Sequence, residues 1–370
     1  MKKTIAMLPG DGIGKEVMDG AKEILKAIGE QFHHTFTFQY GKIGGEALDH
    51  QNDPLPEETL ALCKNSDAVL LGAVGGPKWE SNSPEKRPEK GLLRLRKDMK
   101  LHANIRPVKA YESLADHSPF KKEYVENVDM VIVRELTGGL YFGKPSERQH
   151  AGGKESAVDT LFYSKEEVDR IIRTAFEMAK GRKMKVTSVD KANVLESSRM
   201  WRETAEEIAK EYPDIELEHM LVDNAAMQLI KNPARFDVIV TENMFGDILS
   251  DEASVLTGSL GMLPSASLSE EGLHLYEPVH GSAPDIAGKN LANPLAMILS
   301  AAMMLRQSFG MEAEAEAVEN AVKRVLDGGK LTPDLAVKGK TILSTVEMVE
   351  EVKAVLAEED AILSIMEAYA

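Results

Sequence analysis

Short runs of β-branched and aliphatic residues alternate along the chain with longer segments in which apolar residues recur every three to four positions. Such short runs predict buried strands, and the longer period predicts amphipathic helices. The strands expected from the pattern are residues 4–8, 68–71, 130–133, 185–189 and 237–241. The helices expected are residues 15–28, 165–179, 200–210 and 294–309. This alternation predicts the α/β fold class.

Three segments differ from the regular pattern. Residues 294–309 are apolar nearly all round, which predicts a buried helix or a helix in a subunit interface. Residues 140–162 are polar and rich in glycine, and a long loop or a β-hairpin arm fits them equally well. The tail beyond Thr345 is acidic and helical in pattern, and we interpret it as a solvated face.

The composition is that of an acidic globular protein. The 370 residues suit about two domains, and 43% hydrophobic with 28% charged residues is ordinary for a folded chain. No apolar run reaches the roughly 18 to 20 residues that cross a bilayer, so we expect no membrane partner. The single cysteine, Cys63, cannot form an intrachain disulfide and fits a cytoplasmic protein. The net charge of −16 disfavours nucleic acid as a partner, because a phosphate backbone requires a basic surface.

A glycine cluster, PGDGIG at residues 9–14, follows a predicted strand and opens a predicted helix. Its spacing is G-x-G-x-G, whereas a dinucleotide-binding Rossmann turn has G-x-G-x-x-G. A tight strand-to-helix turn and a phosphate cradle both fit this cluster. We therefore exclude a Rossmann domain and leave the role of the glycines open.

Three arginines are candidates for binding an anion. Arg96 and Arg106 flank a short stretch with a helical pattern, and Arg134 ends a predicted strand, where α/β proteins place site residues. Guanidinium groups bind carboxylates through paired hydrogen bonds, so three could hold a substrate with two carboxylates. Three unrelated surface salt bridges are the alternative. Leu92 and Leu93, one turn before Arg96, would offer apolar contact beside the charges.

Two aspartates are candidates for binding a cation. Asp247 and Asp251 are four positions apart in a predicted helix, so both carboxylates project from one face. Like charges at this spacing repel each other unless a cation lies between them. An all-oxygen site suits Mg²⁺ or Mn²⁺, and Asp223, which follows another strand-like run, is the candidate third ligand. A solvated acidic helix is the alternative.

Two residues are candidates for moving protons. Lys191 directly follows a predicted strand, and near a divalent cation it would lose its proton more easily and could act as a base. A lone lysine is otherwise simply solvated. Tyr141 is either a proton donor or only an aromatic residue of the expected hairpin.

Residues 275–294 form a segment interrupted by glycine and proline that leads into a predicted helix. Its backbone amides and His280 could surround an adenosine. Asp285 could accept hydrogen bonds from the ribose hydroxyls. The same carboxylate would repel a 2′-phosphate, which favours NAD over NADP.

Together, these segments resemble the isocitrate and isopropylmalate dehydrogenase family of β-decarboxylating dehydrogenases. The resemblance runs nearly end to end and in order, from PGDGIGKEV to GSAPDIAGKNLANP. The run NMFGDILSDEASVLTGSLGM is similar to the family signature and is highly specific. We find no departure from the family pattern at a catalytic or metal position.

The resemblance implies an NAD-dependent oxidative decarboxylation of a 2-hydroxy dicarboxylic acid that requires Mg²⁺ or Mn²⁺. Isocitrate-specific members carry a serine and an asparagine where GLLRLR stands here, so Leu92 and Leu93 suggest an isopropyl group in place of a third carboxylate. The expected reaction converts (2R,3S)-3-isopropylmalate to 4-methyl-2-oxopentanoate and CO2 in leucine biosynthesis. The alternatives are D-malate, tartrate or homoisocitrate as substrate, an acyltransferase on a related fold, and a non-catalytic binding protein.

The resemblance also implies a role for each candidate residue. The substrate would contact Leu92, Leu93, Arg96, Arg106, Arg134 and Asp223. The metal would be held by Asp247 and Asp251 of one subunit with Asp223 of the other. Protons would be handled by Tyr141 and by Lys191 donated across the dimer. Residues 76–89 and 280–293 would bind NAD, with contacts from Gly76, Glu89, His280, Gly281, Ser282, Ala283, Asp285 and Asn293.

The fold implied is a non-Rossmann α/β fold of two domains with a cleft between them. One domain would combine residues 1–101 with residues 259–370 and would bind NAD. The other, residues 102–258, would carry the metal site and the dimer interface. Residues of about 140–162 would be an arm exchanged between the subunits of a homodimer with shared active sites.

Overall fold

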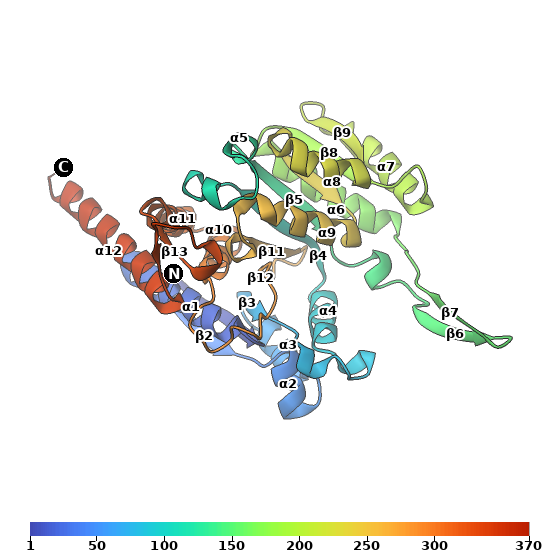
Figure 1. Ribbon diagram of the computed structural model, residues 1–370, viewed down its shortest axis with the longest axis horizontal. Coiled ribbons are helices and arrows are strands. Elements are labelled where there is room, and N and C mark those ends of the chain that lie inside the picture. The colour runs from blue at the N-terminus through green and yellow to red at the C-terminus, as the bar shows by residue number, and fades with distance from the viewer. Residues whose placement is uncertain (370) are drawn as a thin grey trace.

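The computed structural model describes residues 1–369, and it describes all of their side chains except those of residues 116, 117, 151, 359, 360 and 362–369. One ten-stranded sheet runs through the molecule, and helices cover both of its faces (Figure 1). Its strands, in spatial order, are β2 (Thr35–Tyr40), β1 (Lys2–Gly10), β3 (Ala68–Ala73), β12 (Leu275–Pro278), β11 (Pro264–Ser269), β4 (Leu101–Lys109), β5 (Asp129–Glu135), β10 (Val238–Thr241), β8 (Lys185–Asp190) and β9 (Glu216–Leu221).

The helices and the small strands are arranged around this sheet. The helices are α1 (Gly14–Gln31), α2 (Gly44–Gln51), α3 (Glu57–Lys64), α4 (Pro88–Asp98), α5 (Lys122–Val125), α6 (Lys165–Lys180), α7 (Glu196–Ala209), α8 (Val222–Lys231), α9 (Asn243–Ser254), α10 (Leu295–Phe309), α11 (Glu312–Asp327) and α12 (Thr345–Tyr369). The small strands pair as β6 (Glu147–Ala151) with β7 (Lys154–Val158) and β13 (Lys330–Leu331) with β14 (Thr341–Ile342). The five strands and four helices expected from the alternating pattern at the residue ranges given above are all present.

The main sheet is parallel in its two outer parts and antiparallel in the middle. β2, β1, β3 and β12 run parallel at one end, and β5, β10, β8 and β9 run parallel at the other. Between them, β11 pairs antiparallel with β12 and β4, and β4 pairs antiparallel with β5. A doubly wound Rossmann sheet is parallel throughout its central strands. The expected α/β, non-Rossmann fold class is therefore confirmed.

The apolar helix expected over residues 294–309 is α10, and it lies in the core. Its neighbours are β11, β12, α1 and α11, so it is surrounded by packed elements. Ala296, Ile298 and Met304 are fully buried. Residues 295–305 are buried throughout, so this part of the helix has no solvated face and needs no polar stripe. The buried-helix interpretation is confirmed.

The C-terminal tail is helical as expected, but its interpretation as a solvated face is wrong. Met348, Val352 and Leu356 are buried, and α12 packs against α1 and α11. These three residues recur every four positions, so they form one apolar stripe along the helix. The many glutamates of the segment lie around that stripe and obscured it in the sequence.

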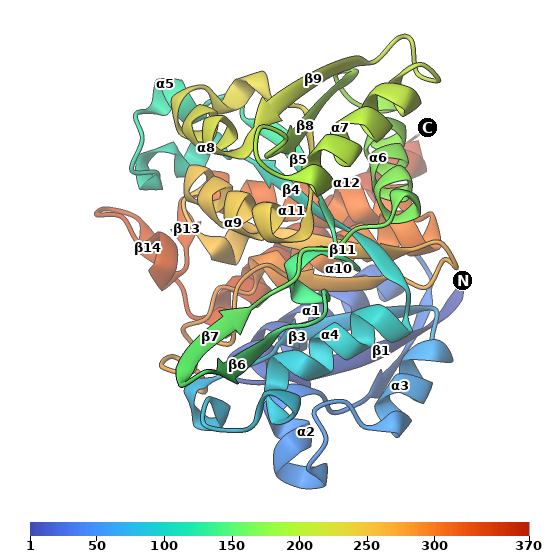
Figure 2. The ribbon, with the colours of Figure 1, turned by 90° about the vertical axis from the view of Figure 1, so that its right-hand side faces the viewer.

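The glycine-rich segment at residues 140–162 contains a β-hairpin, which decides between the loop and the arm. β6 and β7 pair antiparallel with each other and do not join the main sheet. The hairpin projects from the body of the molecule (Figure 1), and in the view turned by 90° it lies in front of the body, on the side that faces the viewer (Figure 2). Its described side chains are mostly exposed in the single chain.

The first and last parts of the chain lie together in one half of the molecule, and the middle part forms the other half (Figure 1). One continuous sheet crosses from one half to the other through the β11–β4 pair. The division into residues 1–101 with 259–370 and residues 102–258 therefore stays a prediction.

The glycine cluster after β1 is a tight turn that packs against two other backbone segments. Gly10 and Gly12 have positive φ angles of 68° and 56°. A Cβ at Gly10 would lie 2.0 Å from the Ala73 carbonyl oxygen, and one at Gly12 would lie 1.9 Å from the Ser282 carbonyl oxygen. The same Ser282 oxygen accepts a hydrogen bond from the Ile13 amide at 2.8 Å. Protein backbone fills the space over this turn, which favours the tight turn over the phosphate cradle.

Candidate active site

Strands β4 and β5 and helix α4 bring the three arginines together as a buried arginine cluster, Arg96, Arg106 and Arg134. Their exposed fractions are 8%, 6% and 2%. The expectation that Arg96 and Arg106 flank a helical stretch is wrong, because Arg96 lies within α4 and Arg106 lies on β4. The strand was missed although its polar and apolar residues alternate. Buried, neighbouring guanidinium groups are not three unrelated surface salt bridges.

Each arginine is oriented by polar partners. Arg96 donates from Nη2 to the Glu277 carboxylate at 2.8 Å. Arg106 donates from Nε to Asn104 Oδ1 at 2.6 Å and from Nη1 to Ser250 Oγ at 2.5 Å. The sequence reasoning did not find these partners. For Asn104 a signal existed, since it lies two residues before Arg106 and so on the same face of a strand.

Burial and mutual repulsion weaken the hold of the cluster on its protons. Burial lowers the pKa of Arg134 to about 10, with a further contribution from the neighbouring Arg106. Burial likewise lowers the pKa of Arg106, and the charge of Arg96 adds to this effect. Because cations held this close repel one another, the cluster favours the binding of an anion beside it.

Helix α9 presents its two aspartates to this cluster. Asp247 forms an ion pair with Arg134 Nη1, and its Oδ1 lies 3.6 Å from Arg106 Nη2. Asp251 Oδ1 lies 3.7 Å from Arg106 Nη1. The close approach requires Gly246, because a Cβ there would lie 2.6 Å from Arg134 Cγ. The two carboxylates therefore lie on one face of α9, and this face meets Arg106 and Arg134.

The two aspartates differ in their electrostatic surroundings. Burial would raise the pKa of Asp247, but Arg134 and Arg106 outweigh this and hold the pKa below its usual value. Burial raises the pKa of Asp251, and repulsion from Asp247 adds to it. Asp251 keeps a side chain that is 63% exposed and accessible to a cation.

Tyr141 lies at the edge of the same group. It ends the short 3₁₀ turn Gly139–Tyr141 that follows β5, and its hydroxyl donates to Asp247 Oδ2 at 2.9 Å. The Arg134 guanidinium carbon lies 5.6 Å from the centre of its ring. Burial and the charge of Asp247 raise the pKa of Tyr141, so its hydroxyl stays protonated at neutral pH.

Lys191 and Asp223 form a separate pair. Lys191 follows β8, Asp223 lies in the first turn of α8, and the Lys191 Nζ to Asp223 Oδ1 distance is 2.6 Å. Among the described residues of the single chain, no three His, Cys, Asp or Glu side chains converge as metal ligands. Asp223 therefore does not join Asp247 and Asp251 within one chain.

In the segments expected to bind NAD, some polar side chains hydrogen-bond other protein groups, and others have no such partner among the described residues. His280 Nε2 is buried and has no hydrogen-bond partner among the described residues, and a Cβ at Gly281 would meet nothing within 4 Å. Asp285 is exposed. Asn293, by contrast, is engaged, since its Nδ2 donates to Asp334 Oδ2 at 3.0 Å and its Oδ1 accepts from the first amide of α10.

The remaining residues of the predicted site lie on or near α4. Leu92 and Leu93 are half-buried and precede Arg96 by one turn. Glu89 opens α4, and its Oε1 lies 2.6 Å from where a Cβ at Gly75 would stand. Glu89 also lines a hollow of about 230 Å³ with Gly76. The helix thus presents an apolar edge and a carboxylate next to the arginine cluster.

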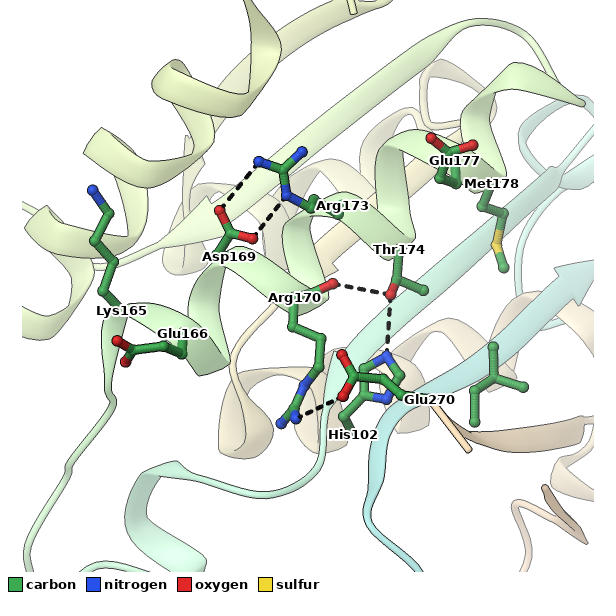
Figure 3. A pocket seen from close by; sticks show the side chains of 11 residues that line it. His102, Lys165, Glu166, Asp169, Arg170, Arg173, Thr174, Glu177, Met178 and Glu270 are labelled. Carbon is green, nitrogen blue, oxygen red and sulfur yellow. Dashed lines mark hydrogen bonds and ion pairs between the residues drawn. The ribbon is translucent and has the colours of Figure 1, made fainter. Parts of the chain in front are cut away.

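A large cavity of about 900 Å³ lies elsewhere. It follows α6 and is lined by charged residues of that helix, by His102 and by Glu270 (Figure 3). Within it, His102 Nε2 lies 3.2 Å from Thr174 Oγ1. None of the predicted site residues lines this cavity, so cavity size alone does not locate the site.

The sequence profile of the isocitrate/isopropylmalate dehydrogenase family matches residues 4–352. The chain therefore belongs to this family of dehydrogenases. It is 69% identical over 370 residues to the 3-isopropylmalate dehydrogenase of Bacillus licheniformis, which covers 100% of both chains. It is 66% identical over 366 residues to that of Bacillus subtilis, covering 99% of this chain and 100% of the other.

A solved structure supports the same assignment. The isocitrate dehydrogenase from Methylococcus capsulatus superposes with a TM-score of 0.85 at 36% identity, covering 96% of this chain and 99% of that one. The family resemblance inferred from the motifs is confirmed. No helix in the described part of the chain combines the length and apolar character needed to span a membrane.

Proposed function

We propose that this chain catalyses the NAD-dependent oxidation and decarboxylation of (2R,3S)-3-isopropylmalate to 4-methyl-2-oxopentanoate and CO2, a step of leucine biosynthesis. The observation that carries the proposal is the buried arginine cluster facing Asp247 and Asp251, with Leu92 and Leu93 one turn before Arg96 on α4. Guanidinium groups pair with both carboxylates of a malate, and the leucines suit an isopropyl group. High identity to 3-isopropylmalate dehydrogenases over the full chain supports the same substrate.

The acidic residues fit a divalent cation. Asp247, Asp251 and Asp223 offer only carboxylate oxygens, which Mg²⁺ and Mn²⁺ prefer. Asp223 and Lys191 are close to each other but not to the other two aspartates in one chain. We therefore infer a homodimer in which Asp223 and Lys191 of the partner subunit complete each site, with the β6–β7 hairpin as the exchanged arm.

The residues of the nucleotide segments fit NAD. His280 has a buried ring nitrogen to which no described residue hydrogen-bonds, and a Cβ at Gly281 would meet no described atom within 4 Å. Asp285 is exposed and free to accept hydrogen bonds from ribose hydroxyls, and its charge disfavours a 2′-phosphate. Ser282 and Ala283 follow as backbone contacts, while Gly76 and Glu89 would border the nicotinamide end.

The chain's own residues then divide the work of the reaction. The arginine cluster holds both carboxylates and fixes C2 in place. When bound, NAD⁺ would supply a hydride acceptor and a divalent cation held by the aspartates would supply a Lewis acid for the oxidation and the decarboxylation. Lys191 of the partner subunit takes the hydroxyl proton at its Nζ. Tyr141 donates its hydroxyl proton to the enolate carbon, since its raised pKa keeps that proton available.

A substrate panel tests the proposal. NADH formation is measured with 3-isopropylmalate, isocitrate, D-malate, tartrate and homoisocitrate, each with and without Mg²⁺. We expect kcat/KM to be at least about tenfold higher for 3-isopropylmalate than for any other substrate, and activity to depend on Mg²⁺. A higher kcat/KM for isocitrate or D-malate would reject the assigned substrate. Leu92→Ser with Leu93→Asn should lower the ratio of kcat/KM for 3-isopropylmalate to kcat/KM for isocitrate. The use of NAD should not change.

A further inference from the structure

Asn243 connects two parts of the candidate active site that lie on different elements. It is the first residue of α9 and is 1% exposed. Its Oδ1 accepts hydrogen bonds from Nε and Nη2 of Arg134 at 3.2 and 2.8 Å. Its Nδ2 donates to the Gly138 carbonyl oxygen at 3.2 Å. Because a guanidinium only donates and a carbonyl only accepts, these contacts fix the orientation of the amide.

The turn that Asn243 reaches leads directly to Tyr141. Glu135 accepts hydrogen bonds from the Thr137 amide at 2.7 Å, the Thr137 hydroxyl at 2.6 Å and the Gly138 amide at 2.9 Å. These hydrogen bonds hold the first residues of the turn, and the side-chain amide of Asn243 holds the carbonyl group of Gly138. The turn is therefore held by two side chains from two different elements of the main fold.

Tyr163 closes the network from a third direction. Its hydroxyl accepts a hydrogen bond from the Asn243 backbone amide at 3.0 Å. Its ring packs against the turn so closely that a Cβ at Gly138 would lie 2.5 Å from Cε1, and one at Gly139 would lie 2.6 Å from the hydroxyl. Side-chain bulk in this turn would push it away from its position. The turn thus has little freedom while Asn243 and Tyr163 are in place.

We propose that Asn243 is a positioning residue that keeps Arg134 and Tyr141 in one fixed relation. Asn243 occupies the Nε and Nη2 side of Arg134, so Nη1 is directed at Asp247, the same carboxylate that accepts from the Tyr141 hydroxyl. The arginine that binds the substrate and the tyrosine that protonates the product are thereby aligned through one buried amide. This inference rests on the proposed function, in which Arg134 binds a carboxylate and Tyr141 donates a proton.

Asn243→Ala removes both side-chain contacts, and the two losses should affect different kinetic constants. Loss of the Oδ1 acceptor loosens Arg134, and we expect the KM for 3-isopropylmalate to rise about tenfold while the KM for NAD is unchanged. Loss of the Nδ2 donor loosens the turn before Tyr141, and we expect kcat to fall about tenfold. Ser300→Ala on α10 is the matched control. It removes a fully buried side-chain hydrogen bond of 2.8 Å distant from this network, and should leave kcat and both KM values unchanged.

A double-mutant cycle with Tyr141→Phe decides whether Asn243 acts through Tyr141. In the Tyr141→Phe background, Asn243→Ala should still raise the KM for 3-isopropylmalate, but it should lower kcat by less than about twofold. If the fold-loss in kcat of the double variant equals the product of the fold-losses of Asn243→Ala and Tyr141→Phe, the positioning role is overturned. Asn243→Asp, similar in shape but unable to donate to Gly138, should give the same kcat result and decides the question if the alanine variant does not fold.

The failure of this inference is distinguishable from the failure of the proposed function. A folded wild-type enzyme without activity on 3-isopropylmalate rejects the function, and the positioning role with it. An active wild type with a multiplicative cycle rejects only the role of Asn243. An unchanged KM for 3-isopropylmalate in Asn243→Ala likewise contradicts the link to Arg134 and leaves the proposed function standing.

Discussion

Glu242 is a buried acid without a partner, and its ionisation should lower the stability of the protein as the pH rises. It precedes α9, is 5% exposed, and neither carboxylate oxygen has a hydrogen-bond partner among the described residues. Burial raises its pKa from 4.5 to about 7; the nearby backbone N–H of Phe245 and the charge of Arg134 offset part of this rise, and the negative charge of Glu135 adds to it. Between these two values the folded state binds a proton that the unfolded state has lost.

The magnitude follows from the two pKa values. Folding stability falls with rising pH wherever the folded state binds more protons than the unfolded state. At about 1.4 kcal/mol per pH unit, a rise from 4.5 to about 7 costs about 3 kcal/mol once Glu242 is ionised in both states. Most of this loss, about 2 to 3 kcal/mol, falls between pH 5 and pH 8. Glu242→Gln has nearly the same shape, cannot ionise, and should not show the loss.

Urea denaturation at fixed protein concentration measures the effect, because the stability of the proposed dimer would depend on concentration. The free energy of unfolding of Glu242→Gln minus that of the wild type should increase by about 2 to 3 kcal/mol from pH 5 to pH 8. Glu203→Gln, an exposed glutamate on α7, is the matched control and should follow the wild type. A difference between Glu242→Gln and wild type that is constant with pH would refute the reasoning.

Three further predictions concern the cation, the cofactor and the assembly. Asp247→Asn removes a ligand charge, so the Mg²⁺ concentration for half-maximal activity should rise at least about tenfold. Asp214→Asn, at an exposed aspartate, is the control and should leave this concentration unchanged. An unchanged Mg²⁺ requirement in Asp247→Asn would contradict the metal assignment. Asp285→Lys with Ile286→Tyr removes a repulsive carboxylate, so the preference for NAD over NADP in kcat/KM should fall at least about tenfold, and an unmoved preference would show that Asp285 does not face the ribose. Lys191→Ala and Asp247→Ala, refolded together at equal ratio, should recover about a quarter of wild-type activity, because half the dimers are mixed and each has one intact site. No recovery above the separately refolded variants, with mixed dimers confirmed by mass, would rule out a shared site.

Local spacing was sufficient to predict part of the candidate site. Asp247 and Asp251 are neighbours because residues four apart on a helix share a face, and this needs no knowledge of the rest of the fold. Lys191 and Arg134 were found because Lys191 directly follows a strand and Arg134 lies near the end of one. For residues 140–162, the glycines and polar residues limited the prediction to two alternatives, a long loop or a β-hairpin arm. These features depend on short-range geometry that the sequence encodes directly.

Long-range packing was not predictable from local pattern. Arg106 was assigned beside a helix because its strand, β4, is half polar, and the place of β4 in the sheet follows from its pairing with β5 and with β11, about 160 residues further along the chain. Asn243 was overlooked because its role depends on Gly138 and Arg134, more than 100 residues earlier in the chain. The apolar stripe of α12 was hidden among glutamates. In each case tertiary contacts gave a residue a role that its neighbours in sequence do not reveal.

The stoichiometry of a single reaction tests the proposed function most directly. Purified protein is incubated with limiting 3-isopropylmalate, excess NAD⁺ and Mg²⁺, and the products are quantified after completion. NADH is read by absorbance, CO2 by trapping, and the 2-oxo acid by mass spectrometry. Oxidative decarboxylation predicts one NADH, one CO2 and one 4-methyl-2-oxopentanoate for each 3-isopropylmalate consumed. NADH formed without CO2, or no NADH from a folded and Mg²⁺-supplied protein, would contradict the account.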